Sequence, residues 1–457
     1  MPPNQGPAPF SDPLLPQLGL SHSPYYTQLH HDLRAYCRNY ISSELLPYAQ
    51  EWETAGQVPE EVRIRHCQRG FAITHPVQDP ADAGGIKLPN EVPFEKWDTW
   101  CSMIVGDEMS RMGWCGVGWG LGVGNSIGCP PIARFGTKEQ RQRWLPGVAR
   151  GELRFCLGIT EPEAGSDVAN IQTTATREGD HWVVNGAKKW ITNGIWCDYC
   201  TAAVRTGGPQ HSGISLLVVP LKVKGVTTRR MYNTGVHASG KKFAPFNVSL
   251  CPFLNAPYSP RLVTGSTFIT FEDVHVPLDN LIGPLNGGFA LIMSNFNPER
   301  LSLATASLRL ARVCAEDAYN YACERHTFGK PLIQHPGIRS KIASFGLLIE
   351  PAHAFLEQLI FIIEEARVTG KEVNVGGMTA LLKVMSTRAL EKVCRESQQI
   401  MGGAGYSKSG KGARIEQISR DVRVHVVGGG SEEIMLDLAV RQEERDVALR
   451  AKEMSKL

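Results

Sequence analysis

The pattern of apolar and polar positions divides the chain into helix-forming and strand-forming stretches. Within residues 25–154 the pattern is mostly helical, because Leu29, Leu33 and Tyr40 recur at the spacing of one buried helix face. Thr137 stands where an N-cap is expected, directly before a polar helical stretch. The first third of the chain is therefore predicted to be a helical domain.

The pattern changes near residue 155. Stretches such as HWVVNGAKKWIT and STFITFEDVHVP alternate apolar with polar residues, are rich in β-branched side chains, and are punctuated by Asn-Gly and Gly. Long helical patterns return after Gly287, and the strand–helix alternation of a doubly wound sheet is missing. We therefore expect an α+β protein with a helical domain at 25–154, a β domain at 155–277 and a second helical domain at 278–450.

Three segments do not fit this division. Residues 1–24 are rich in Pro and Gly and predict a flexible arm. Residues 241–265 contain several prolines and no clean periodicity, so they are either an inserted surface loop or a stretch that does not belong in the mature chain. The tail, 451–457, ends in Ser455-Lys456-Leu457, the tripeptide read by the peroxisomal import receptor, and so predicts a peroxisomal protein.

Composition and charge exclude several classes of partner. Apolar residues make up 42% of the chain and charged residues 20%, which is typical of an ordinary soluble protein. A net charge of +3, with no dense Lys/Arg cluster, gives no reason to expect nucleic acid as a partner. No uninterrupted apolar run is long enough for a membrane span. The 12 cysteines lack a disulfide rhythm, and Cys197 and Cys200 are interpreted as packing residues.

Two segments of the β domain could hold a planar or anionic group. The first, 159–173 (ITEPEAGSDVANIQT), has small residues and hydroxyls that expose backbone N–H groups, although an ordinary loop would look the same. The second, 188–194 (KKWITNG), places Trp190 and Thr192 two apart on a predicted strand, and therefore on the same face. A flat indole beside a hydroxyl could line a planar cofactor, whereas the alternative is a core Trp.

Two segments of the second helical domain could bind phosphate. In 324–335 (ERHTFGKPLIQH), Arg325 and Thr327 could bind phosphate by charge-assisted hydrogen bonds, or the basic residues could complement a helix dipole. Segment 398–421 begins as a helix that ends at paired glycines, which form either a C-cap or a backbone-lined anion site.

Taken together, these segments resemble the acyl-CoA dehydrogenase family over residues 28–445. TEPEAGSD is similar to the family's TEPGAGSD, with Glu163 in place of Gly, and KKWITNG, ERHTFGKP, QIMGGAGY and RDVRVHVVGGGSEEI are similar to further family blocks in the same order. The resemblance implies a helical N-terminal domain, a middle β-barrel and a C-terminal four-helix bundle. It also implies bound FAD, an acyl-CoA substrate and a homo-oligomer, either a dimer or a tetramer.

The resemblance also implies a set of flavin contacts. Trp190 would pack on the isoalloxazine ring, and the Thr192 hydroxyl would lie at its N5 atom. His335 falls at a contact position, although Pro336 stands where the family often has Gln. The full implied set is Leu157, Ile159, Thr160, Ser166, Trp190, Ile191 and Thr192 at the ring and ribityl chain; Arg325, Thr327, Phe328 and His335 at the pyrophosphate and adenosine side; Gln399, Gly402 and Gly403 from the partner subunit; and Gly430, Ser431 and Glu433 after the glycine run.

The reaction of this family needs a carboxylate base, and its usual position in this chain is Gly429. Some branches, including those acting on isovaleryl-CoA and long-chain acyl-CoA, keep Gly there and place the Glu on the first long helix of the C-terminal domain. This chain has Glu299 at that alternative position. The other interpretation makes Glu299 a first-turn acid, with Asn297 as N-cap and Pro298 as first helical residue. The resemblance further implies that Ser166, Asn297 and Arg300 contact the substrate.

These residues predict dehydrogenation of an acyl-CoA thioester to a trans-2-enoyl-CoA, with Glu299 removing the α-proton and FAD taking the β-hydride. The electron acceptor would be an electron-transfer flavoprotein or O2, because a short peroxisomal oxidase is a close alternative. A flavoprotein of this fold without dehydrogenase activity is a further alternative.

Overall fold

A computed structural model describes the chain except residues 1–7, 14–23, 75–76, 78, 239–264 and 455–457. The expected insertion at 241–265, up to residue 264, and the C-terminal tripeptide therefore lie outside the described residues. The chain forms two compact units. The first comprises Met1–Ser43, Glu95–Gly113 and Phe296–Leu457, and the second comprises Glu44–Phe94 and Trp114–Asn295.

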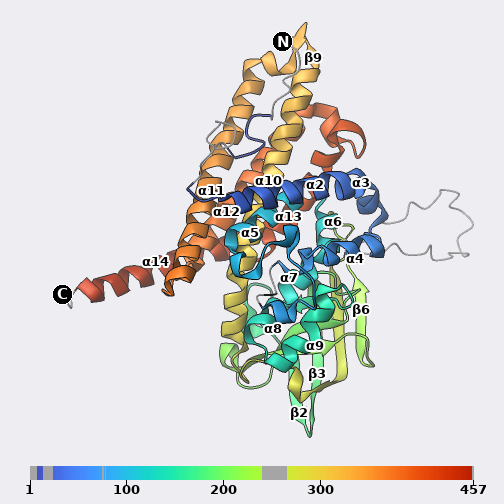
Figure 1. The fold of residues 1–457 in the computed structure, drawn as a ribbon, viewed down its shortest axis with the longest axis vertical. Coiled ribbons are helices and arrows are strands. Elements are labelled where there is room, and N and C mark those ends of the chain that lie inside the picture. The colour runs from blue at the N-terminus through green and yellow to red at the C-terminus, as the bar shows by residue number, and fades with distance from the viewer. Residues whose placement is uncertain (1–7, 14–23, 75–76, 78, 239–264, 455–457) are drawn as a thin grey trace, which may run out of the picture. The chain divides into compact units, whose positions relative to one another are not determined.

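The first unit is helical. Helix α12 (Gly376–Met401) packs against α11 (Pro336–Thr369), α13 (Ala413–Val427) and α14 (Glu432–Met454). The orange and red helices in Figure 1 trace this bundle. The N-terminal part of the unit adds α2 (Gln28–Tyr40), which packs against α5 (Thr99–Ser110) through its expected face, where Leu33 and Tyr40 are buried.

Helix α11 is long and apolar enough, by length and composition alone, to cross a membrane. It also carries acidic side chains that are paired within its own unit. Glu350 accepts a hydrogen bond from Arg312 at 2.7 Å, and Glu357 accepts one from Tyr26 at 2.6 Å. Buried or half-buried acidic residues that pair with other segments of the same unit are typical of a core helix in a bundle.

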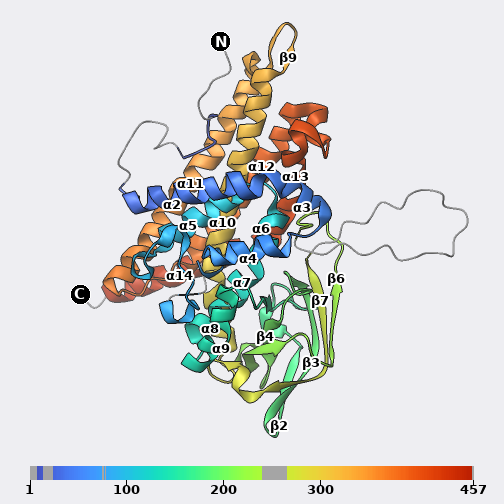
Figure 2. The ribbon, with the colours of Figure 1, turned by 45° about the vertical axis from the view of Figure 1, so that its right-hand side comes forward.

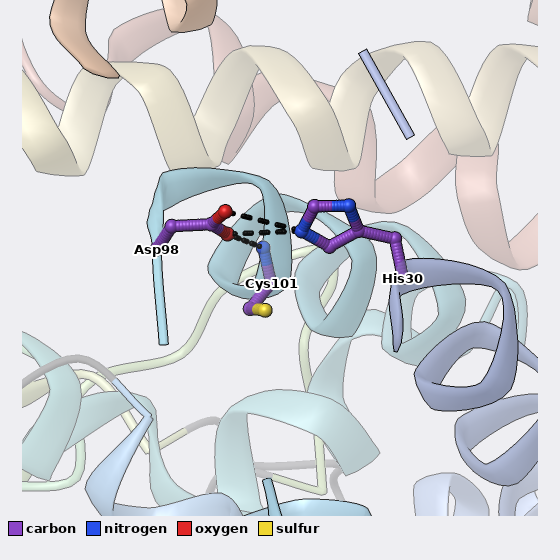
Figure 3. Close-up of side chains that lie close together, drawn as sticks. All are labelled: His30, Asp98 and Cys101. Carbon is purple, nitrogen blue, oxygen red and sulfur yellow. Dashed lines mark hydrogen bonds and ion pairs between the residues drawn. The ribbon is translucent and has the colours of Figure 1, made fainter. Parts of the chain in front are cut away.

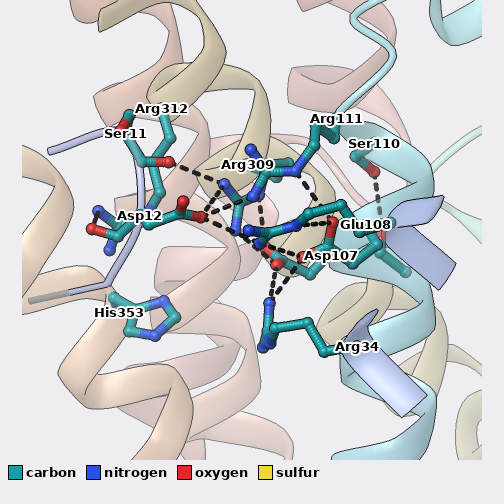
Figure 4. A network of polar contacts seen from close by, with 12 residues as sticks. Ser11, Asp12, Arg34, Asp107, Glu108, Ser110, Arg111, Arg309, Arg312 and His353 are labelled. Atoms are coloured by element: carbon teal, nitrogen blue, oxygen red, sulfur yellow. Dashed lines mark hydrogen bonds and ion pairs between the residues drawn. The ribbon is translucent and has the colours of Figure 1, made fainter. Parts of the chain in front are cut away.

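The segment Ala8–Pro13 differs from the flexible arm expected from composition. Ala8 and Ser11 are buried, and the Asp12 carboxylate accepts hydrogen bonds from Arg111 at 2.6 Å and Arg309 at 3.0 Å. Figure 4 shows Asp12 facing these guanidinium groups. For residues 8–13 the arm prediction is therefore wrong, because one carboxylate and the backbone carbonyl groups of the segment bind arginines that composition cannot reveal.

The second unit combines short helices with a sheet. Its helices are α3 (Leu46–Ala55), α4 (Glu60–Gln68), α6 (Cys115–Gly118), α7 (Gly124–Gly128), α8 (Pro130–Phe135) and α9 (Lys138–Ala149). Thr137 caps α9 as predicted: its hydroxyl accepts from the Gln140 N–H at 3.2 Å, and the Gln140 side chain accepts from the Thr137 N–H at 2.9 Å.

The strands of this unit form one sheet in the order β6-β7-β3-β2-β4-β5-β8, with β1 pairing with β4 in parallel. Figure 2 shows β3, β6 and β7 side by side. The bounds are β1 Phe155–Gly158, β2 Thr174–Glu178, β3 His181–Ile191, β4 Tyr199–Arg205, β5 Ile214–Pro220, β6 Val226–Arg230, β7 Thr267–Pro277 and β8 Leu281–Ile282. The predicted order of helical, sheet and helical regions is confirmed, although β8 extends the sheet past residue 277.

Two details of the sheet refine the sequence analysis. Asn185-Gly186 was expected to punctuate strands, but it lies inside β3 at a β-bulge opposite β7, where Gly186 has a φ of 140°. Cys197 and Cys200 are both buried in the hydrophobic core of the sheet, together with Cys156. Their interpretation as packing residues is confirmed.

Candidate active site

The end of β3 and the loop after β1 lie together in the second unit. The Lys189 N–H donates to the Thr160 carbonyl oxygen at 2.8 Å, which aligns the predicted flavin loop with Trp190. A second bulge falls between Lys188 and Ile191, where Trp190 has a φ of 65° and is 52% exposed. Bulky residues rarely adopt a positive φ, and those that do cluster at functional sites.

This bulge changes one prediction. Trp190 and Thr192 were expected two apart on a regular strand, but β3 ends at Ile191 and Thr192 begins a turn. Strand alternation therefore does not position the Thr192 hydroxyl. Of the other predicted flavin residues in this unit, Ile159 and Ile191 are buried, Leu157, Thr160 and Thr192 are half-buried, and Ser166 is exposed.

A buried ion pair that the sequence analysis missed holds this loop. The Lys188 ammonium donates to Glu161 Oε1 at 2.7 Å and to the Ile159 carbonyl oxygen at 3.1 Å. The Glu161 carboxylate also accepts from the backbone N–H groups of Gln172 and Thr173. Burial disfavours charge on both partners, but the pair and these hydrogen bonds offset it, and the pKa of Glu161 stays below its ordinary value. Two consecutive lysines on a strand must point to opposite faces, which is the signal that could have identified Lys188.

The predicted phosphate-side residues lie in the first unit. Strands β9 (His326–Thr327) and β10 (Lys330–Pro331) form a small hairpin after α10 (Gly288–Glu324). The hydroxyl of Thr327 lies 3.1 Å from Nε2 of His335, and the Phe328 ring is 95% exposed. The predicted residues Thr327, Phe328 and His335 thus lie together at this hairpin. Arg325 and, at the end of α12, Gln399, Gly402 and Gly403 are exposed.

The glycine run Gly428–Gly430, here named the glycine corner, joins α13 to α14. Gly429 has a φ of 67° and Gly430 a φ of 115°, so both adopt conformations that favour glycine. A Cβ atom on Gly429 would lie 3.0 Å from Leu303 Cδ1. Arg300 Nε donates to the Gly429 carbonyl oxygen at 2.9 Å, so the corner packs directly on the turn of α10 that follows Glu299. Ser431 is half-buried and Glu433 is exposed just beyond the corner.

Glu299 lies inside α10 and not at its start. The helix begins at Gly288, so the interpretation of Asn297 as N-cap and Pro298 as first helical residue is wrong. A proline inside a helix leaves the carbonyl four residues earlier without its N–H donor. Here that carbonyl belongs to Ser294, and it accepts from Arg134 Nη1 at 3.3 Å. The Asn297 side chain instead accepts from Arg300 Nη1 at 3.1 Å.

The Glu299 carboxyl group is held in an environment that raises its pKa. Its Oε2 atom is buried and has no hydrogen-bond partner within the described part of the chain. Burial raises the pKa of Glu299 to about 7, against the opposing effect of the Arg300 charge. Glu299 as a whole is half-buried, but a buried carboxyl oxygen without a hydrogen-bond partner is costly for stability and is typical of a catalytic acid or base.

His30, Asp98 and Cys101 place metal-ligating atoms within 4.8 Å of one another (Figure 3). The imidazole of His30 and the carboxylate of Asp98 have structural partners. His30 Nδ1 lies 3.0 Å from the Thr27 N–H, and His30 Nε2 lies 3.1 Å from an Asp98 oxygen. Asp98 Oδ1 accepts from the Cys101 N–H at 2.8 Å, which caps α5. Burial raises the pKa of the Cys101 thiol, so the thiolate that a metal ion needs is disfavoured.

Comparison with known proteins decides the family. Models of the N-terminal, middle and C-terminal domains of acyl-CoA dehydrogenases match residues 27–152, 156–245 and 286–443. The chain belongs to the acyl-CoA dehydrogenase family. The resemblance and the predicted fold class are thereby confirmed, and members of this family are FAD-dependent oxidoreductases.

Individual members of the acyl-CoA dehydrogenase family match over nearly the whole chain. The acyl-CoA dehydrogenase AFT10-1 of Alternaria alternata is 45% identical, over 92% of this chain and 93% of its own. The acyl-CoA dehydrogenase apdG of Emericella nidulans is 39% identical, over 95% of this chain and 94% of its own. The crystal structure of an acyl-CoA dehydrogenase from Geobacillus kaustophilus superposes with a TM-score of 0.77 at 29% identity, covering 92% of this chain and 99% of that one.

Proposed function

We propose that this acyl-CoA dehydrogenase uses FAD to convert an acyl-CoA thioester into a trans-2-enoyl-CoA, with Glu299 as the base. The proposal rests on the environment of the Glu299 carboxyl group. Its Oε2 atom is buried without a hydrogen-bond partner in the described residues, and its pKa is raised to about 7 by burial. A base whose pKa lies near the operating pH combines a large ionised fraction with adequate proton affinity.

The residues present fit FAD. Trp190 and Phe328 expose aromatic rings on which a flavin or an adenine can pack, and Arg325 is an exposed cation suited to a pyrophosphate. An added Cβ at Gly402 or Gly403 would meet no atom within 4 Å, so these positions leave room for a bound group from a second copy of the chain. When bound, FAD supplies the acceptor for the β-hydride of the substrate.

The role of Glu299 in this reaction is to remove the α-proton. The thioester acidifies that proton, and the carboxylate takes it while the β-hydrogen leaves as hydride. Burial of the carboxylate strengthens its basicity, because an unpaired charge in a poorly solvated site gains by becoming neutral. Arg300 opposes this effect and keeps part of the population ionised near neutral pH.

An anaerobic titration tests the proposed function. The yellow holoprotein is mixed with a panel of saturated acyl-CoAs, and the flavin absorbance near 450 nm is followed together with the enoyl-CoA formed. Stoichiometric bleaching with at least one acyl-CoA supports dehydrogenation, and a flavin that no acyl-CoA bleaches contradicts it. Aerobic release of H2O2 without an added acceptor would assign O2 as the electron acceptor, and turnover that needs an electron-transfer flavoprotein would assign that protein.

The rate of flavin reduction should depend on pH in a defined direction. The base must be ionised, and the pKa of Glu299 is raised, so the rate should increase with pH as Glu299 loses its proton. We expect the rate to rise about tenfold per pH unit below about 7 and then to level off. Anaerobic stopped-flow measurements from pH 5.5 to 8 check this, with bound FAD quantified at each pH. A profile that is flat down to pH 5.5 would exclude a base with a raised pKa.

A further inference from the structure

Lys383 is a fully buried lysine in the first unit, on the stripe of α12 that faces its neighbours. Its ammonium group donates to two backbone carbonyl oxygens, those of Val426 and, at 2.9 Å, Gly430. These carbonyl groups lie at the end of α13 and in the glycine corner. The last carbonyl groups of a helix have no partner within the helix, so they need donors from elsewhere when they are buried.

A second cation completes this arrangement. Arg300 Nε donates to the Gly429 carbonyl oxygen at 2.9 Å, between the two carbonyl groups that Lys383 binds. Lys383 from α12 and Arg300 from α10 thus hold the same short segment by its carbonyl groups. The segment needs such support, because two consecutive residues with positive φ, Gly429 and Gly430, have no side chains with which to pack.

Burial of the charged Lys383 side chain lowers the stability of the fold. Within the described residues, no carboxylate oxygen lies within 4 Å of its ammonium group. Arg300 repels it, and Glu432, the acid that attracts it, is hydrogen-bonded to Arg388. A buried charge without a carboxylate partner weakens the fold, so its presence at the corner to which Arg300 is bonded favours a functional role.

We propose that Lys383 is a positioning residue for the base: bonded to the carbonyl groups of Val426 and Gly430, it fixes the glycine corner on which Arg300, and hence the helical turn bearing Glu299, is held. This inference rests on the proposed function, because it takes Glu299 as the base. Lys383 acts on the base only through the corner and Arg300.

Because the inference depends on the charge of Lys383, it predicts that the reaction rate changes with pH. Burial, with repulsion from Arg300, lowers the pKa of Lys383 to about 8. The charge-assisted bonds to the corner are therefore present below pH 8 and weaken as the pH rises past it. The other groups that face Lys383 do not titrate there: burial and the Lys383 charge lower the pKa of His425 to about 4, and the pKa of Glu432 is held below its ordinary value by Arg388.

Three variants of the full-length holoprotein test the inference by anaerobic flavin reduction from pH 6 to 9.5, with a reactive acyl-CoA as substrate. Lys383→Met removes the donor and should reduce the rate about 10- to 100-fold, as expected for a misplaced catalytic group, and should also weaken retention of FAD. Lys383→Arg keeps a charged donor, should hold most of the rate, and should lose the decline that the wild type shows above pH 8. Lys392→Met, an exposed lysine of the same helix, is the control and should behave like the wild type.

Two outcomes would overturn the inference. One is a Lys383→Met holoprotein with the rate and pH profile of the wild type. The other is a Lys383→Arg protein whose rate declines above pH 8 as in the wild type, a measurement that stays decisive where Lys383→Met fails to fold. Both differ from failure of the proposed function, in which Glu299→Gln would retain full activity whatever residue stands at 383.

Discussion

Glu299→Gln should abolish most flavin reduction by acyl-CoA while leaving the yellow holoprotein intact. Glutamine has nearly the same shape but cannot accept a proton, so the rate should fall by about 10²–10⁴-fold, the range that general bases contribute. The variant should also melt at an equal or higher temperature at pH 8. Burial raises the pKa of Glu299, so ionisation destabilises the wild type progressively as the pH rises from 4.5 to about 7; this cost is fully present at pH 8, and the neutral amide removes it. Stopped-flow absorbance and thermal unfolding measure the two effects.

The nearest competing acid supplies the comparison for this experiment. Glu432 lies just beyond the glycine corner and is hydrogen-bonded to Arg388 at the surface. Glu432→Gln should reduce flavin within about fivefold of the wild-type rate, since surface ion pairs contribute little. Fast bleaching in Glu299→Gln together with slow bleaching in Glu432→Gln would transfer the role of base to Glu432.

Asp107→Ala should destabilise the protein more than other single changes to its ion pairs. Arg309 is fully buried and binds Asp107 through two hydrogen bonds, of 2.9 and 2.6 Å, and Arg34 adds a third at 2.7 Å (Figure 4). Removing the carboxylate takes from a buried guanidinium the partner that binds it through two hydrogen bonds and leaves it only Asp12 and the Ser11 carbonyl oxygen, at a cost of about 3–5 kcal/mol. A large drop in the melting temperature of the holoprotein, measured by differential scanning calorimetry, is the expected result.

A double variant and an exposed aspartate complete this test. Asp107→Leu combined with Arg309→Leu removes both charges, so it should recover much of the stability that Asp107→Ala loses. Asp437, which pairs with Arg441 on the solvent-exposed face of α14, provides the control, and Asp437→Ala should change the free energy of unfolding by less than about 1 kcal/mol. Equal losses in Asp107→Ala and Asp437→Ala would show that the buried network contributes no more than a surface pair.

The parts of the fold that depend on local pattern could be predicted from sequence. Thr137 caps α9 because its hydroxyl and Gln140 are three residues apart, a relation visible in the chain itself. The alternative that started a helix at Pro298 was wrong because proline is also a favourable first helical residue, while the donor that compensates it inside α10, Arg134, is distant in sequence. Asp12 was missed for the same reason, since its arginine partners come from other helices.

The candidate site likewise contains residues that could be predicted from sequence and residues that could not. Glycine at 429 and glutamate at 299 were linked by resemblance, and the structure adds that the Arg300 side chain reaches the Gly429 carbonyl group. Lys383 was not selected, because a lysine in an amphipathic helix is ordinarily solvent-exposed. Its helical spacing from Thr379, Ala380 and Leu390, which are all buried, is the signal that could have revealed it.

The positive φ of Gly429 has a consequence for how this enzyme can evolve. Two of the four glycine codons differ from a glutamate codon by a single base, so one mutation in such a codon would place a glutamate at position 429. That mutation would put a side chain into the left-handed region of backbone space, with its Cβ atom 3.0 Å from Leu303. A glutamate at position 429 is therefore expected to be poorly tolerated unless Leu303 changes as well.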